Sequence, residues 1–422
     1  MSAHWSSDLT GAAARCRQGH QATRPQIRTS RPGGKDRRSA TRRDALRARF
    51  AITLLTAVAL GTLAAPAMAE VKLGLGAPLT GPNAPIGEQF RRGADAAVKA
   101  LNASGGVNGE QVTLVYGDDA SDPRQGVAAA NDMINQGVVA VIGHYNSSVS
   151  IPASTVYAEE GVLQITPGST NPQLTEQGIK TVFRTCGRDD QQGDVAGKFL
   201  ATAYKGRKVA ILEDQTTYGK GVADTTKARM NSLGLQEVMY EGITVGERDF
   251  SAIVSKMKAA SVDAVFFGGL YNEGGLILRQ MRDQGVKAQF LSPDGTVSQE
   301  FWGITGPSGQ GALVTFGPEM RDQPQARDAV AKLRAEGYDP EGYTLYTYAA
   351  VQAWAAAAKK AGSTDGAKVA AALHDGSAYD TVIGPLTFDA KGDPTGSNYV
   401  LYSWQDGKMV QLTDAQVAKL GH

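Results

Sequence analysis

The sequence predicts an α/β protein made of two lobes. Short apolar runs alternate with amphipathic stretches along most of the 422 residues, which is typical of helices packed on mainly parallel sheets. This alternation follows residue 70 for roughly a hundred residues and begins again near residue 208. The 50 glycines and 17 prolines favour many tight turns between the elements.

The first lobe is predicted to begin with an apolar strand. The helix after it is indicated by Phe90, Ala94 and Val98, which share one face at helical spacing. Further apolar runs and amphipathic stretches follow in the same order. We expect strands at residues 71–77, 111–116 and 138–143, and helices at 87–103, 124–135 and 149–159.

The second lobe repeats this pattern over residues of about 190–316. Its strands are expected at 208–213, 263–267 and 289–291, and its helices at 219–233, 250–260 and 273–284. Beyond it, helices at 325–336 and 344–361 and a strand at 400–404 are too few for a third domain. We therefore expect this tail to complete the first lobe and to cross back.

Residues 1–69 are predicted to be a leader that is removed on export to a periplasm. They hold 12 basic and 3 acidic residues, followed by an apolar stretch and a small-x-small cleavage site at 67–69. The mature chain would begin at Glu70. The arginine pair at 42–43 is typical of twin-arginine export, but Ala45 stands where such signals carry a large apolar residue. We therefore expect the general secretory (Sec) route.

The composition of the remaining chain argues against several functions. It holds 31 basic and 39 acidic residues, and an acidic balance disfavours nucleic acid as a partner. Cys186 is the single cysteine after the leader and cannot form an internal disulfide. Phosphate-binding, zinc-protease, redox and serine-hydrolase motifs are all absent from the sequence. We predict no enzyme activity, catalytic residue, cofactor or metal, and interpret the acidic cluster at 118–122 as a solvated turn with a helix cap.

Function is expected in the loops after the strands, because ligands of open α/β sheets bind at the carboxyl ends of the strands. Ser147 and Ser148 stand near the start of a predicted helix. Backbone N–H groups and a hydroxyl at such a position suit a carboxylate, although the spacing alone favours a simple helix cap.

Three other candidates follow strands. The turn Gly168-Ser169-Thr170 carries hydroxyl groups and allows close backbone approach, but it could equally be a surface turn. In the second lobe, Tyr218 and Asp294 also follow strands. A carboxylate there would pair with a cation.

In these segments the chain resembles the leucine/isoleucine/valine-binding proteins, which are type I periplasmic solute-binding proteins of branched-chain amino-acid ABC transporters. The resemblance extends over residues 71 to about 405. It depends on the order and spacing of many short motifs, which include Pro78-Leu-Thr-Gly81-Pro82, Tyr116-Gly-Asp-Asp119, Val141-Ile-Gly-His144, Ile165-Thr-Pro167, Tyr218-Gly219, Asp249-Phe250-Ser251 and Ile383-Gly-Pro-Leu-Thr387.

This resemblance implies a Venus-flytrap fold in which three crossover segments join two lobes. The lobes would comprise residues 70–189 with about 319–398, and about 190–316 with about 399–422. The protein would be a monomer that captures leucine, isoleucine or valine and presents it to a membrane permease. Two cysteines that form a small disulfide in the family are replaced by Ser121 and Asn146.

The resemblance also implies roles for individual residues. Ser147 and Thr170 would hold the ligand carboxylate, the Gly168 carbonyl and the Asp294 carboxylate would hold its ammonium group, and Tyr218 would close over it. Ser169 would belong to the same turn.

Three positions depart from the leucine-binding pattern. Ile86 replaces an aromatic residue, Leu270 with Tyr271 next to it replaces a tyrosine, and Asp294 replaces a glutamate. The ligand could therefore be another amino acid, an amide, urea or an aromatic acid, and a ligand-sensing receptor on the same fold is the alternative role.

Overall fold

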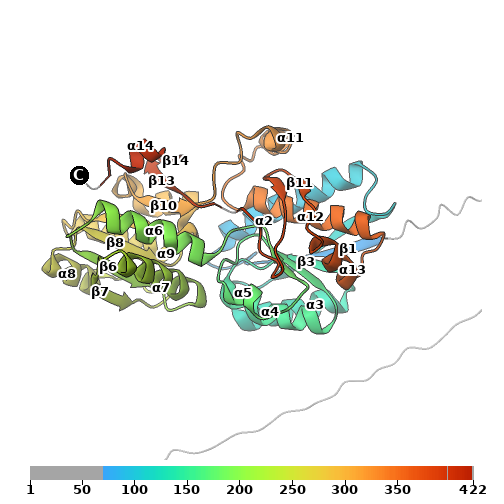
Figure 1. The fold of residues 1–422 in the computed structure, drawn as a ribbon, viewed down its shortest axis with the longest axis horizontal. Helices are drawn as coiled ribbons and strands as arrows, with labels where there is room; N and C mark the ends of the chain where they lie inside the picture. The colour runs from blue at the N-terminus through green and yellow to red at the C-terminus, as the bar shows by residue number, and fades with distance from the viewer. Residues whose placement is uncertain (1–69, 397, 421–422) are drawn as a thin grey trace, which may run out of the picture. The chain divides into compact units, whose positions relative to one another are not determined.

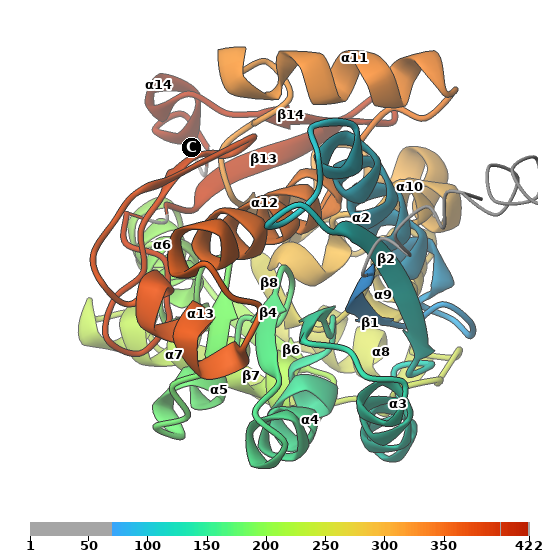
Figure 2. The ribbon, with the colours of Figure 1, turned by 90° about the vertical axis from the view of Figure 1, so that its right-hand side faces the viewer.

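The computed structural model describes residues 70–396 and 398–420 (Figure 1). The predicted leader, residues 1–69, lies outside them. The described residues form two large sheets with helices packed around them, which confirms the predicted α/β class (Figures 1 and 2). Within this part of the chain, no helix has both the length and the apolar character that crossing a membrane requires.

The first sheet is parallel throughout, with the strand order β2-β1-β3-β4-β5. β3 and β4 are buried at every residue. Helices cover both faces of such a parallel sheet. Its strands are therefore buried on both sides and are rich in apolar residues. The strands are β1 (Glu70–Ala77), β2 (Gln111–Asp118), β3 (Ala140–Gly143), β4 (Leu163–Thr166) and β5 (Val182–Arg184).

Helices from distant parts of the chain pack together beside this sheet. α2 contacts α12, as Figure 2 also shows. The approach is so close that a Cβ atom on Gly93 would lie 2.3 Å from the Thr344 carbonyl oxygen, so this crossing requires glycine. The neighbouring elements are α2 (Ala84–Ala103), α3 (Pro123–Asn135), α4 (Ser147–Glu159), α5 (Gln173–Glu176), α11 (Arg327–Ala335), α12 (Thr344–Ala361), α13 (Gly366–Leu373), β11 (Tyr379–Thr381) and β12 (Gly384–Leu386).

The second sheet has the strand order β14-β13-β10-β9-β8-β6-β7. Its strands run parallel except β13, which pairs antiparallel with both of its neighbours, β10 and β14. The strands are β6 (Val209–Glu213), β7 (Glu237–Gly242), β8 (Ala264–Gly268), β9 (Gln289–Ser292), β10 (Leu313–Phe316), β13 (Val400–Gln405) and β14 (Lys408–Gln411). The helices that accompany them are α6 (Asp189–Ala203), α7 (Thr217–Ser232), α8 (Ser251–Ala260), α9 (Tyr271–Asp283), α10 (Gln299–Thr305) and α14 (Asp414–Val417).

The chain passes between the two sheets three times. The crossings lie between β5 and α6, between β10 and α11, and between β12 and β13. Short 3-10 turns occur at Asp294–Thr296, Gly306–Gly309 and Pro324–Ala326. The arrangement confirms the predicted two-lobed fold with three crossovers. Among the elements that the sequence pattern does not predict are β5, α6, β7, α10, β10, α13 and β14.

Candidate functional site

Loops from both sheets meet around one small cavity. Three consecutive lining residues follow β3, one follows β4, one lies in the first turn of α7 and one follows β8. The lining residues are Tyr145, Asn146, Ser147, Gly168, Tyr218, Leu270 and Tyr343. The cavity volume is about 10 Å³, which is the room that a single water molecule needs. An amino acid can therefore reach this position only if the two halves move apart.

The structure brings four of the residues singled out in the sequence to this cavity. They are Ser147, Gly168, Tyr218 and Leu270. Five others do not line it, namely Ile86, Ser169, Thr170, Tyr271 and Asp294. All five are buried.

Ser147 is the first residue of α4 and not its cap. The N-cap position belongs to Asn146, whose side chain makes no capping hydrogen bond. The Ser147 side chain is buried, and its Oγ accepts a hydrogen bond of 3.2 Å from the Asn171 backbone N–H. A helix start also presents backbone N–H groups that have no partner within the helix. The capping interpretation is therefore wrong for Ser147.

The three residues of the turn at 168–170 lie in different environments. Ser169 is committed to the loop after β3, because its Oγ lies 2.6 Å from Ser150 Oγ and donates to the Tyr145 carbonyl at 2.9 Å. Thr170 is fully buried, and its Oγ1 has no hydrogen-bond partner in the described part of the chain. At Gly168, a Cβ atom would lie 2.9 Å from the Tyr145 ring, so a larger residue there would displace that ring.

Tyr218 and Asp294 form a hydrogen-bonded pair in the second half of the molecule. The Tyr218 hydroxyl donates to Asp294 Oδ1 at 2.7 Å. Gln192 Nε2 donates to the same oxygen at 3.1 Å, and Gln192 Oε1 accepts from the Asp294 backbone N–H at 2.8 Å. Asp294 is buried, and this burial raises its pKa to about 6. Its charge would therefore be stabilised by a nearby cation.

The three positions that depart from the leucine-binding pattern lie in different surroundings. Ile86 belongs to α2 and is part of the hydrophobic core. Leu270 lines the cavity. The next residue, Tyr271, points elsewhere, because its hydroxyl donates to the Pro82 carbonyl at 2.5 Å.

Comparison with known proteins places the chain in a family. The family model for periplasmic binding proteins matches residues 70–408. The chain belongs to the periplasmic binding protein family. A Leu/Ile/Val-binding protein homolog 1 from Brucella suis is 53% identical over 358 residues, which are 84% of this chain and 96% of the relative.

Solved structures of related proteins have the same fold as this periplasmic binding protein. A leucine-binding protein from Thermotoga maritima has a TM-score of 0.75 at 28% identity, over 81% of this chain and 98% of that one. A branched-chain amino acid transporter substrate-binding protein from Streptococcus pneumoniae, in complex with isoleucine, has a TM-score of 0.74 at 25% identity, over 82% and 100%. The resemblance stated from the sequence motifs is thereby confirmed.

In this periplasmic binding protein, a buried polar network holds the loop that leads from β3 to Ser147. His144 Nδ1 lies 2.6 Å from Asp119 Oδ2, and its Nε2 lies 2.8 Å from the Tyr157 hydroxyl. All three side chains are fully buried. Asp119 therefore does not belong to a solvated turn as predicted, because it is the buried partner of His144. Asp122 does cap a helix, since it accepts from two backbone N–H groups at the start of α3.

Sequence reasoning missed four residues at or near the cavity, which are Tyr145, Asn146, Asp189 and Tyr343. Tyr145 stands in the motif that drew attention to Ser147, so its position in the loop after β3 could have indicated it. Asp189 is fully buried at the start of α6, and its pKa is raised well above the usual value by burial and by the negative charge of Asp294. Tyr343 follows no strand. No sequence signal therefore linked it to the site.

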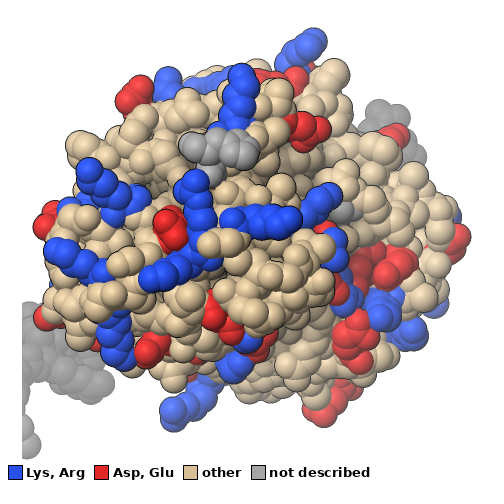
Figure 3. Space-filling model, turned by 60° about the vertical axis from the view of Figure 1, so that its left-hand side comes forward, with Lys and Arg blue, Asp and Glu red and all other residues tan. Residues whose placement is uncertain are grey.

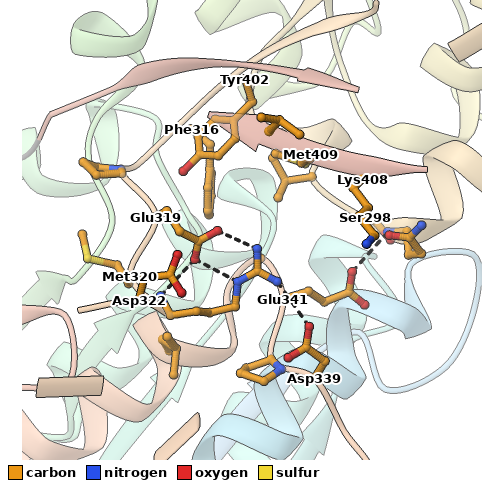
Figure 4. Close-up of a pocket in the computed structure, with 18 of the residues that line it drawn as sticks. Ser298, Phe316, Glu319, Met320, Asp322, Asp339, Glu341, Tyr402, Lys408 and Met409 are labelled. Carbon is orange, nitrogen blue, oxygen red and sulfur yellow. Dashed lines mark hydrogen bonds and ion pairs between the residues drawn. The ribbon is translucent and has the colours of Figure 1, made fainter. Parts of the chain in front are cut away.

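Two other features do not form a second candidate site. A larger cavity of about 560 Å³ lies beside the crossover after β10, but its Arg321 already pairs with Glu319 at 2.5 Å and with Asp339 at 3.4 Å (Figure 4). Cys186 is buried, and burial raises its pKa far above the usual value. A thiol of this kind is unreactive. Within the described residues, no cluster of acidic, histidine or cysteine side chains could hold a metal ion.

Proposed function

We propose that this protein captures leucine, isoleucine or valine between its two halves and delivers it to the permease of an ABC transporter. One observation carries the proposal: groups that suit both charges of an amino acid either line the same cavity or are hydrogen-bonded to a residue that lines it. Ser147 comes from the first half, and the Tyr218–Asp294 pair comes from the second. The names of the relatives described above support the choice of ligand.

The carboxylate of the ligand would bind at the start of α4. The Ser147 hydroxyl and the backbone N–H groups of the first helical turn are donors suited to an anion. The unpartnered Oγ1 of Thr170 supplies a further buried hydroxyl group. Hydrogen-bonded burial of this kind is what a charged group needs to be tolerated inside a protein.

The ammonium group would bind between the Asp294 carboxylate and the Gly168 carbonyl. Burial raises the pKa of Asp294 to about 6, so the ionised carboxylate gains from a cation beside it. Tyr218 lines the cavity while holding Asp294, and it would close over the ligand. Ser169 would take part through the backbone of its turn, because its hydroxyl is engaged elsewhere.

The ligand side chain would meet Leu270 and the rings of Tyr145 and Tyr343. Ile86 would support this wall from the core. These residues differ in shape and polarity from a purely aliphatic pocket. One of them favours a second candidate, the same role for a more polar amino acid or an amide, because the buried Tyr145, which lines the cavity, carries a hydroxyl group.

The cellular setting follows from the same proposal. The chain would be exported by the Sec route to the periplasm, lose residues 1–69 and act as a monomer without enzyme activity, cofactor or nucleic-acid partner. Lys and Arg occur together with Asp and Glu on the face shown in Figure 3. The lobes would comprise residues 70–189 with about 319–398, and about 190–316 with about 399–422.

A thermal-shift panel on the chain from Glu70 tests the proposal. The protein is unfolded and refolded to remove any ligand carried through purification, then melted with each of the 20 L-amino acids, urea, small amides and benzoate. A ligand at 100 times its Kd adds about 2.7 kcal/mol of stability. We expect shifts with leucine, isoleucine and valine. A response to urea, an amide or benzoate alone would refute the assignment of Ser147 and Asp294 to the two charges of an amino acid.

A further inference from the structure

We infer that Tyr271 and Asn272 are positioning residues that set ligand affinity by holding the two halves of the protein together. They act without contacting the ligand. The inference rests on the proposed function, because it concerns how tightly the same site retains its amino acid. It assigns Tyr271 a role different from the ligand contact that the sequence resemblance implies.

Two hydrogen bonds join the rims of the cleft at this point. The Tyr271 hydroxyl donates to the Pro82 carbonyl at 2.5 Å, and Asn272 Nδ2 donates to Asn83 Oδ1 at 3.1 Å. Tyr271 and Asn272 begin α9, directly after β8 of the second sheet. Pro82 and Asn83 lie between β1 and α2, beside the first sheet. We call these four residues the rim contact.

The rim contact is pre-arranged on the side of the first sheet. Asn83 is buried, and its Nδ2 donates to Ser121 Oγ at 2.9 Å. That bond fixes the amide so that its Oδ1 faces Asn272. Ser121 thus orients the acceptor.

The rim contact is separate from the ligand cavity. None of its four residues lines the cavity, although Leu270, which precedes Tyr271, does. One residue of the chain therefore faces the ligand position and the next two face the opposite rim. The other side of the cleft is different: Asn171 reaches across to the Thr217 carbonyl at 2.8 Å, but its backbone also contacts Ser147. The rim contact can thus be removed without changing any residue that lines the cavity.

The cavity must widen to hold an amino acid, and the inference requires that the rim contact persists in that ligand-bound closed form, where it acts on every ligand alike. A ligand that needs the closed form binds with an affinity reduced by the fraction of molecules able to close. Loss of the rim contact lowers that fraction, so the Kd values of all ligands should rise by a common factor. Loss of a residue that contacts the ligand side chain would change the ratios between ligands.

The test uses Tyr271→Phe, Asn272→Ala and the double variant of the mature chain. Kd is measured by calorimetry for leucine, isoleucine and valine, and the radius of gyration by X-ray scattering with and without ligand. We expect each Kd to rise roughly 2- to 10-fold, by the same factor for the three amino acids, as the loss of one or two hydrogen bonds implies. Without ligand the variants should be more open than the wild type, and at saturation all should have the same radius.

Two exposed substitutions serve as matched controls. Tyr116→Phe and Asn131→Ala remove the same chemical groups far from the cleft, where both side chains bond only within the first half. Unchanged Kd values and radii in the rim variants would overturn the inference, as would unequal factors among the three ligands. If the wild type binds none of the three, the proposed function fails. The radius without ligand then still decides whether the rim contact favours closure.

Discussion

Tyr218 is hydrogen-bonded both to the Asp294 side chain and to the backbone of the next residue, Gly295. The Tyr218 hydroxyl donates to Asp294 Oδ1 at 2.7 Å and accepts from the Gly295 backbone N–H at 2.7 Å. Both residues belong to the second half of the molecule, so their geometry does not depend on closure. A group held in place before the ligand arrives loses less conformational entropy on binding.

Replacing Asp294 tests the ammonium assignment. Asp294→Ala should weaken the binding of leucine by about 2 to 5 kcal/mol, because the ligand ammonium would be buried without its charged partner. Calorimetry gives the difference directly. The exposed Asp132→Ala should bind as the wild type does. An Asp294→Ala variant with wild-type affinity would exclude Asp294 from the site.

The pKa of Asp294 predicts a pH dependence of binding. Burial raises it to about 6, so at pH 5 most of the ligand-free protein is protonated there and the ammonium group must displace that proton. We expect Kd to be about tenfold higher at pH 5 than at pH 7, since one proton is exchanged. In Asp294→Asn this part of the pH dependence should vanish. An equal slope in both proteins would contradict the prediction.

The same raised pKa has the opposite effect on the stability of the ligand-free protein. Between pH 3.8 and about 6, folded Asp294 holds a proton that the unfolded chain has released. Its contribution to the free energy of unfolding therefore falls as the pH rises through this window. Urea unfolding of wild type and Asp294→Asn at pH 4 and pH 7 measures it, and the wild type should lose stability relative to the variant at the higher pH.

Ser147→Ala tests the carboxylate assignment. The loss of one buried donor should weaken leucine binding by roughly 1 to 3 kcal/mol. Leucinamide, which lacks the carboxylate charge, should lose less. The exposed Ser104→Ala, whose hydroxyl bonds to its own helix, is the control and should leave both affinities unchanged. Equal losses for leucine and leucinamide would argue against a carboxylate at Ser147.

Tyr157→Phe tests the network behind the ligand loop. It removes the hydroxyl that lies 2.8 Å from His144 Nε2. A buried polar atom without a partner costs about 1 to 3 kcal/mol, so the free energy of unfolding should fall by that amount. Tyr116→Phe, at a half-exposed position, should change it by less than about 0.5 kcal/mol. Equal effects in urea titrations would mean that the network adds no stability.

The sequence predicted those elements whose apolar pattern is strong. β6 and β8 are fully buried apolar runs, and α2 has one clear apolar face. β7 was missed because it lies at the edge of the sheet, where it is only partly buried, and because its sequence Glu-Val-Met-Tyr-Glu-Gly has a short apolar run between two charged residues. α6 was missed because its first turn is polar and its buried face includes Gln192 and two glycines.

The sequence predicted site residues only where those residues follow strands. Ser147, Gly168 and Tyr218 stand directly after predicted strands, and the rules for α/β sheets indicate such positions. Tyr343 and Asp189 reach the same region through the crossovers, and no local pattern encodes which segments those crossovers bring together. The burial of Asp119 was also unpredictable, because its partner His144 lies in another loop.

Because β10 pairs with β13, the second sheet is completed only by a strand near the carboxyl end of the chain. Leu313 of β10 pairs with Ser403, and Trp404, which is almost fully buried, packs against Phe301. The second half is thus finished by strands near the carboxyl end of the chain, just as α12 completes the packing beside α2. A nascent chain stopped before residue 400 would therefore contain the whole first sheet but would lack β13 and β14 of the second.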